Sequence, residues 1–290
     1  MKIAFIILSC DFPGNHFTRL LERLAEFEDS VIYIHHDYSQ NDFAKSLLNR
    51  FNIVMAKNNY VTYWSHINNV KATWDLLKQA NEECKPDWTI TLTPTCYPIK
   101  SISQIENFLK ESEYDGYMSH RKVTSTPVWE LDQWIYRDMY HRKIVIPIIN
   151  RPIFIKRRKS KVPFDDSFPI WHGSNYFMLN NKAVSELLSQ EDTYRRLVNF
   201  YEGIKSTEQH PCPQEIVLQS IIINNCKTLK INNDYYRFTK WINGVWSPIY
   251  LTEANFDEIR DSNSLFARKF RSPESDELVK LIDNMIQKRN

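Results

Sequence analysis

The sequence predicts an α/β sandwich built around a mostly parallel sheet. Apolar, β-branched runs of strand length alternate along the chain with segments of helical hydrophobic spacing, the pattern of strands joined by helices. The chain has 290 residues, 42% of them hydrophobic, which is enough to bury the core of one large domain. No repeat or low-complexity segment is visible. We therefore expect a single domain over residues 1–290.

The alternation is clearest in the N-terminal part of the chain. Residues 3–9 (IAFIILS) are an apolar run of strand length, and residues 16–27 place their apolar side chains on one face of a helix. Further along, the pattern predicts strands at 31–37, 52–57 and 88–93 and a long amphipathic helix at 66–83.

The chain changes character at residues 120–165 and then returns to α/β patterning. Residues 156–161 (KRRKSK) are a basic run, which is usually a solvated loop face and alternatively a contact with an anionic membrane surface. Residues 171–188 predict a strand, a turn and a helix. Residues 213–225 predict a helix that begins at Pro213 and holds Gln214 and Glu215 in its first turn.

Composition excludes several functional classes. Lys+Arg number 37 and Asp+Glu 35, so there is no basic excess of the kind that nucleic-acid binding requires. Only five glycines are present, and none forms a Gly-rich phosphate loop. The five cysteines include no CxxC pair, which argues against a zinc knuckle or a disulfide framework. The N-terminal apolar run is too short to span a bilayer, so we expect a reducing, cytoplasmic setting.

Polar residues follow the predicted strands, where ligands gather in such sheets. They are Ser9-Cys10-Asp11, His35-His36-Asp37 and Thr93-Pro94-Thr95-Cys96. The His-His-Asp run resembles a metal cluster, but neighbouring strand residues point to opposite faces and cannot all reach one ion. We interpret it as a nucleotide-recognition element, and we expect no metal site.

Three further positions have side chains suited to catalysis or binding. Glu215, near a predicted helix start, would stay ionised as a general base must, although a plain capping acid is the alternative. Arg268 and Lys269 are adjacent cations in an apolar segment and suit a diphosphate, or are a surface pair. Trp241, which follows Arg237 and Lys240, would stack on a sugar or lie in the core.

These segments, in this order, resemble the core-2/I-branching β-1,6-N-acetylglucosaminyltransferase family (glycosyltransferase family 14), which includes peptide O-xylosyltransferases. The resemblance covers nearly the whole chain outside residues 120–165. It is carried by the segments IAFIILSCDFP, VIYIHHDYS, VTYWSHINNVKATWDLL, LTPTCYPIKSISQIENFL, WHGSNYFMLNNKAV, CPQE and SLFARKF.

The resemblance implies a GT-A-like α/β/α sandwich that transfers a sugar from a UDP-sugar with inversion and without a metal or other cofactor. Residues 1–119 would be the nucleotide-binding half, 120–165 a variable acceptor-side insertion, and 166–290 the catalytic and acceptor half. Glu215 matches the family's catalytic base. The implied donor-binding residues are Ser9, Asp37, Trp64, Ser65, Cys96, Ser174, Arg268 and Lys269, and the implied acceptor-binding residues are Trp241 and Arg237.

The chain departs from the family pattern at several points. Cys96 replaces an Asp that precedes Y/F-P, CPQE replaces SPDE, and a second basic residue is absent near SPIYLT. N-acetylglucosamine is the favoured donor sugar; xylose, glucuronic acid, galactose and glucose stay open, as does a non-catalytic UDP- or glycan-binding module. The acceptor would be a glycan or glycolipid in a bacterial-type cytoplasmic enzyme, with residues 156–161 as a candidate membrane contact.

Overall fold

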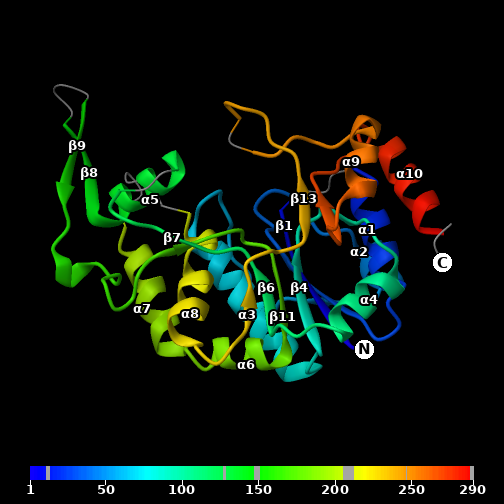
Figure 1. Ribbon diagram of the computed structural model, residues 1–290, viewed down its shortest axis with the longest axis horizontal. Coiled ribbons are helices and arrows are strands. Elements are labelled where there is room, and N and C mark those ends of the chain that lie inside the picture. The colour runs from blue at the N-terminus through cyan, green and yellow to red at the C-terminus, as the bar shows by residue number, and fades with distance from the viewer. Residues whose placement is uncertain (11–13, 127–128, 147–150, 205–211, 246, 288–290) are drawn as a thin grey trace.

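The computed structural model describes residues 1–290 except 11–13, 127–128, 147–150, 205–211, 246 and 288–290, and it leaves out the side chains of residues 145–152. Asp11 and Pro211 of the predicted motifs lie outside the described residues. A seven-stranded sheet runs in the order β12-β6-β11-β4-β1-β2-β3 through the middle of the molecule (Figure 1). Its strands are β1 (Ile3–Ser9), β2 (Val31–His36), β3 (Ile53–Met55), β4 (Trp88–Leu92), β6 (Gly116–Met118), β11 (Phe177–Asn180) and β12 (Ile231–Asn232).

The sheet is mostly parallel, as predicted. β1 pairs in parallel with β2 and β4, while β11 runs antiparallel to both β4 and β6. Ser9 lies opposite His36 in this register, so the carboxyl ends of β1 and β2 meet at one edge. The predicted gathering of polar strand ends at one edge of the sheet is therefore confirmed for these two strands.

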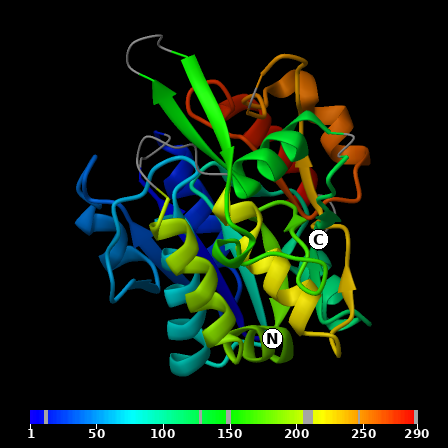
Figure 2. The same ribbon diagram turned by 90° about the vertical axis from the view of Figure 1, so that its left-hand side faces the viewer.

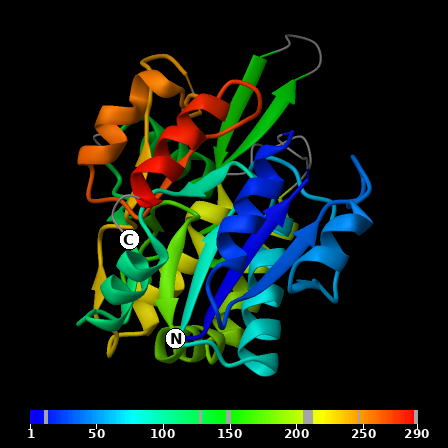
Figure 3. The same ribbon diagram turned by 90° about the vertical axis from the view of Figure 1, so that its right-hand side faces the viewer.

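Helices cover both faces of the sheet, which explains why central strands such as β1 and β4 are buried on both sides. Alternate residues of β1 enter different cores: Phe5 packs with α1, whereas Ile6 packs with α3. Figure 3 shows the face that carries α1 and α10, and Figure 2 shows the opposite face with α3, α7 and α8. The helices are α1 (His16–Ala25), α2 (Lys45–Arg50), α3 (Ile67–Glu83), α4 (Ile102–Lys110), α5 (Glu130–Tyr140), α6 (Asn181–Leu188), α7 (Glu191–Glu202), α8 (Val217–Asn225), α9 (Phe256–Asp261) and α10 (Asp276–Gln287).

The start of the helix predicted at Pro213 differs from expectation. Residues Pro213–Glu215 form a 3-10 turn, η2, and α8 begins only at Val217. The preceding Cys212 has φ 40°, and Ile216 at φ −129° interrupts the helical geometry. Glu215 is therefore the last residue of a tight turn that precedes α8, not part of the first turn of an α-helix.

Short strand pairs connect segments that are far apart in the sequence. β14 (Phe266–Arg268) lies between β13 (Arg237–Thr239) and β5 (Cys96–Pro98), which sets Arg268 opposite Cys96. β7 (Arg121–Lys122) pairs with β10 (Trp171–His172), which sets His172 opposite Arg121. β8 (His141–Ile146) and β9 (Arg151–Lys156) form a hairpin that stands out from the body (Figures 1 and 2). Two further 3-10 turns are η1 (Lys159–Lys161) and η3 (Glu253–Asn255).

Gly173 allows β10 to pass close to the chain after β6. A Cβ atom at this position would lie 1.8 Å from the carbonyl oxygen of Ser119. Gly173→Ala must therefore displace backbone, and we expect it to lower the free energy of unfolding by roughly 1–3 kcal/mol in denaturant titrations.

Gly203→Ala is the matched control for this substitution. Gly203 has φ −74° and its Cβ would come no closer than 3.3 Å to the carbonyl oxygen of Asn199, so we expect little change. Equal unfolding free energies for the two variants would contradict the described close approach.

Candidate active site

Glu215 and His172 form the centre of the candidate site. Nε2 of His172 lies 3.2 Å from Oε2 of Glu215, and Nδ1 lies 2.9 Å from Oδ1 of Asp132. The side chains of His172 and Asp132 are each 4% exposed, whereas that of Glu215 is 31% exposed. One carboxylate is therefore buried behind the imidazole, and the other is accessible in front of it.

Backbone contacts fix the position of Glu215 as well. The N–H of Gly173 donates to the carbonyl oxygen of Glu215 at 2.9 Å. On the other side of η2, Oγ of Ser65 accepts the N–H of Cys212 at 2.9 Å, at the residue with the left-handed φ. The turn that carries Glu215 is thus held by β10 and by Ser65.

Two carboxylates and one guanidinium surround the His172 ring. Burial alone would lower the pKa of His172, but hydrogen bonds with Asp132 and Glu215 outweigh burial and raise that pKa above its usual value. Burial likewise would raise the pKa of Asp132, but the bonds to His172 and Arg121 lower it. Arg121 contacts Asp132 through Nε at 2.6 Å and Nη2 at 2.8 Å. The two carboxylates thus favour the protonated form of His172, and the charge of Arg121 opposes it.

Arg121, Asp132 and His172 were absent from the site predicted by sequence. Arg121 and Asp132 lie in the segment 120–165, which was expected to be a variable acceptor-side insertion. No local motif joins these residues: the pairing of β7 with β10 brings Arg121 to His172, and α5 brings Asp132 to both. The position of His172 directly before GSNYF is the one sequence signal that pointed to it.

Two arginines surround Tyr176 on the cationic side of the site. The guanidinium carbons of Arg268 and Arg237 lie 4.6 Å and 4.9 Å from the Tyr176 ring centroid. Glu215 is near enough to Arg268 for the two charges to interact. Nε of each arginine and Nη1 of Arg237 are buried without a hydrogen-bond partner among the described residues. Buried donors of this kind suit an anion.

Lys269 extends the cationic side toward the surface. Its Nζ donates to Oγ of Ser247 and lies 5.8 Å from the Tyr250 ring centroid. Burial and the neighbouring charge of Arg268 lower the pKa of Lys269. A bound anion would offset both effects.

The two residues predicted to bind the acceptor lie in different surroundings. Trp241 is 58% exposed, so its alternative as a core residue is excluded. Arg237 is 5% exposed and donates through Nη2 to the Thr91 carbonyl oxygen, because the first residue of β13 points inward. This burial argues against a direct contact between Arg237 and an acceptor.

Most of the other residues predicted to bind the donor make hydrogen bonds or close polar contacts within the protein. The carboxylate of Asp37 accepts from Ser39 and Thr62, and these bonds outweigh burial to lower the pKa of Asp37 to about 2. Ser9 Oγ lies 3.2 Å from His36 Nδ1. Cys96 and Ser174 are held in place too: Cys96 Sγ lies 3.5 Å from Thr93 Oγ1, and Ser174 Oγ accepts from the Tyr176 N–H. Trp64, by contrast, is 81% exposed.

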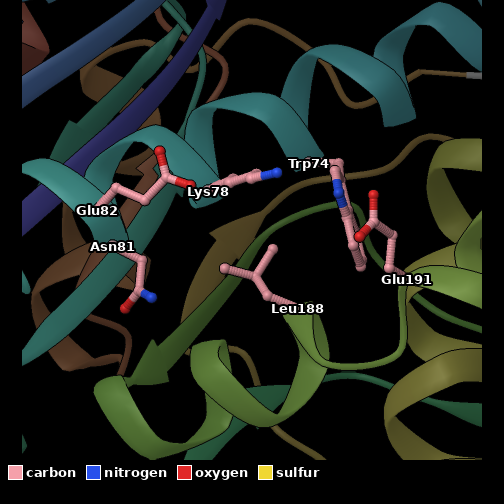
Figure 4. Close-up of a pocket in the computed structure, with 6 residues that line it drawn as sticks. All are labelled: Trp74, Lys78, Asn81, Glu82, Leu188 and Glu191. Carbon is pink, nitrogen blue, oxygen red and sulfur yellow. The ribbon is translucent and has the colours of Figure 1, made fainter.

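An open pocket of about 170 Å³ lies elsewhere, between α3 and the α6–α7 region (Figure 4). It is lined by Trp74, Lys78, Asn81, Glu82, Leu188 and Glu191, and it includes none of the predicted site residues. Within the described ranges, no group of three His, Cys, Asp or Glu side chains is placed to bind a metal. No described helix is long and apolar enough to cross a membrane.

Comparisons with known proteins give one curated relative and several distant solved structures. The Arabidopsis thaliana beta-glucuronosyltransferase GlcAT14B is 25% identical over 280 residues, which cover 90% of this chain and 58% of the relative. Mouse xyloside xylosyltransferase 1 is 11% identical with a TM-score of 0.41, over 92% of this chain and 97% of that structure. The galactosyltransferase LgtC is 9% identical with a TM-score of 0.43, over 98% and 96%.

The family assignment rests on the family model rather than on these distant structures. The model described as "Branch: Core-2/I-Branching enzyme" matches residues 3–260, which contain β1, the Glu215 turn and the segments of the predicted resemblance up to α9. The chain therefore belongs to the core-2/I-branching enzyme family.

Proposed function

We propose that this chain is an inverting, metal-independent glycosyltransferase that moves a sugar, with N-acetylglucosamine as the leading candidate, from a UDP-sugar to a glycan hydroxyl. The observation that carries the proposal is the pairing of Glu215 with His172: an accessible carboxylate held by a buried imidazole, with Arg268 close by. A carboxylate in this position is suited to act as a general base.

The proposed reaction is a single in-line displacement. The acceptor oxygen forms a bond to the anomeric carbon as the bond from that carbon to the β-phosphate oxygen breaks. The hydroxyl proton passes to Glu215, and the electron pair of the broken bond leaves with UDP. Attack occurs on the face opposite the leaving group, so an α-linked donor gives a β-glycoside.

Arg268 and Lys269 would stabilise the charge that develops on the departing diphosphate. Their placement on and beside β14, with buried guanidinium donors at Arg268 and Arg237, supports this role. Fixed cations can supply the electrostatic stabilisation that a divalent ion supplies in metal-dependent enzymes. Arg237 was predicted from sequence as an acceptor contact. Because its side chain is buried, it is better suited to hold Tyr176 and Arg268 in position.

The donor sugar and the acceptor are the open parts of the proposal. The name of the Arabidopsis relative specifies glucuronosyl transfer, which keeps glucuronic acid beside N-acetylglucosamine as a candidate. Trp241 offers an exposed aromatic face on which the apolar side of an acceptor sugar can stack. A panel of UDP-sugars, assayed for turnover, separates the donor candidates.

We further propose that the β8–β9 hairpin contacts an anionic membrane surface. Ile153 and Ile155 on β9 are 42% and 51% exposed, and the segment that follows holds the exposed Arg158 and Lys159. Exposed aliphatic side chains beside cations suit a bilayer that carries anionic lipids, where each basic residue contributes about 1 kcal/mol. A glycolipid acceptor would lie at the same surface.

Glu215→Gln tests the catalytic assignment. The amide cannot accept the hydroxyl proton, so we expect kcat to fall by roughly 10²–10⁴-fold while UDP affinity stays nearly unchanged. Turnover assays and calorimetric UDP titration measure the two quantities. Wild-type turnover in this variant would overturn the assignment, and a wild-type protein that binds UDP but transfers no sugar would favour the non-catalytic binding module.

Removing metal and removing the cation are expected to have opposite outcomes. Transfer should persist in EDTA, whereas Lys269→Ala should weaken UDP binding and lower kcat by roughly 10²-fold, because a fixed charge on the leaving group is lost. Strict dependence on Mn²⁺, or unchanged UDP affinity in the variant, would contradict the cation-based mechanism.

Ile155→Gln tests the membrane contact in co-sedimentation with vesicles. We expect the wild type to bind vesicles of phosphatidylcholine with phosphatidylserine, to lose that binding at high salt, and to bind pure phosphatidylcholine weakly. Ile155→Gln should bind the anionic vesicles less. Leu281→Gln on α10, where the native side chain is 38% exposed, is the control and should bind as the wild type does; an equal loss in both variants would contradict the assignment.

A further inference from the structure

The network behind Glu215 is more elaborate than a capping acid or a simple general base requires. His172, Asp132 and Arg121 are contributed by β10, α5 and β7, and they form an unbroken chain of contacts from the accessible carboxylate to a partly exposed guanidinium. Placing an imidazole and a carboxylate at 4% exposure has a desolvation cost. Each buried group is compensated by a charged partner at hydrogen-bond distance.

We propose that His172, oriented by Asp132, is a positioning residue for Glu215: it holds Oε2 so that Oε1 is directed to the acceptor hydroxyl. This inference rests on the proposed function, because it assigns a role relative to the catalytic base. Among the described residues, no hydrogen bond reaches Oε1 of Glu215. The accessible side of the carboxylate is therefore the side that a substrate can approach.

The neighbours of the His172 ring determine which nitrogen carries the proton toward Glu215. An ionised carboxylate can only accept, so Nε2 must be protonated to bond Oε2. Nδ1 lies 2.9 Å from Asp132 and 2.6 Å from Nη2 of Arg121. A protonated Nδ1 donates to Asp132, and an unprotonated Nδ1 accepts from Arg121. Both arrangements keep the Nε2–H directed at Glu215, so the contact survives a change in the charge of the ring.

The charge of His172 has a separate effect from its hydrogen bond. The charged groups that face the ring are Asp132 on α5, Glu215 on η2 and Arg121 on β7. A positive ring adds electrostatic attraction to its hydrogen bond with Oε2 of Glu215. A neutral ring keeps the orientation but gives up this electrostatic support.

Substitution of His172 by glutamine or by asparagine tests the roles of its two ring nitrogens separately. The amide nitrogen of glutamine reaches the position of Nε2, and that of asparagine reaches the position of Nδ1. We expect His172→Gln to keep much of the wild-type kcat, since it can still donate to Glu215. We expect His172→Asn and His172→Ala to lose roughly 10–10²-fold in kcat with KM values for donor and acceptor changed little, because orientation rather than binding is lost.

The pH profile supplies a readout that a purely structural role would not move. In His172→Gln the neutral amide replaces a ring whose raised pKa keeps it charged at low pH, and this charge disappears as pH rises through that pKa. The acid limb of the kcat/KM profile should therefore move to higher pH in this variant. Asp132→Asn, which retains an acceptor but removes the charge behind the ring, should move the same limb in the same direction by less.

The control is His141→Gln. His141 follows the last residue of α5, and its Nδ1 lies 3.1 Å from the carbonyl oxygen of Arg137, away from the network. It should retain the wild-type kcat and pH profile. Thermal unfolding and UDP affinity are measured for every variant, to identify any variant whose fold is damaged. If His172→Ala does not fold, the comparison of kcat between His172→Gln and His172→Asn tests the positioning role.

The outcomes separate this inference from the proposed function. If Glu215→Gln is inactive while His172→Asn has the wild-type kcat and His172→Gln keeps the wild-type acid limb, the positioning role is wrong and the catalytic base stands. If Glu215→Gln is fully active, the proposed function fails first. Equal losses in the glutamine and asparagine variants, with no shift in the acid limb, would reduce His172 to a packing residue and overturn the inference.

Discussion

The candidate site depends on the contact between the η2 turn and β10. Through this contact Glu215 receives a backbone hydrogen bond from Gly173 and a side-chain hydrogen bond from His172, two consecutive residues of one strand end. Gly173 also lies against Ser119, at a distance that leaves no room for a Cβ atom. Contacts with the end of β10 therefore help to set the position of the Glu215 carboxylate.

The strand topology also sets the positions of the cationic side chains of the site. β14 inserts between β13 and β5, so Arg268 ends up beside Cys96 at the carboxyl side of β4, and Lys269 follows it toward the surface. The family's Asp position, occupied here by Cys96, is fully buried in this small sheet. The site therefore has an acidic side, where Glu215 contacts His172, and a basic side, where Arg237 and Arg268 lie against Tyr176.

The main elements were predictable because their physical signals are local. Strands such as β1 are apolar on both faces, and helices such as α3 repeat their apolar residues at helical spacing. The role of Glu215 was predicted from its motif and stays a prediction, whereas the 3-10 turn was not predicted, since Pro213 suits the start of either kind of helix. Arg237 was implied as an acceptor residue by the family resemblance, and a strand of three residues carries too little alternation to show that its side chain points inward. Arg121 and His172 meet through the long-range pairing of β7 with β10, and Asp132 reaches both from α5; a single sequence holds no signal for either contact.

The most direct test of the account is a crystal structure with a UDP-sugar and an acceptor bound. We predict that the acceptor hydroxyl lies about 2.6–3.2 Å from Oε1 of Glu215, that Oε2 remains on His172, and that the diphosphate lies against Arg268 and Lys269 with no metal between them. A diphosphate bound through a divalent ion, or an acceptor hydroxyl placed away from Glu215 with its carboxylate turned from the donor, would contradict it.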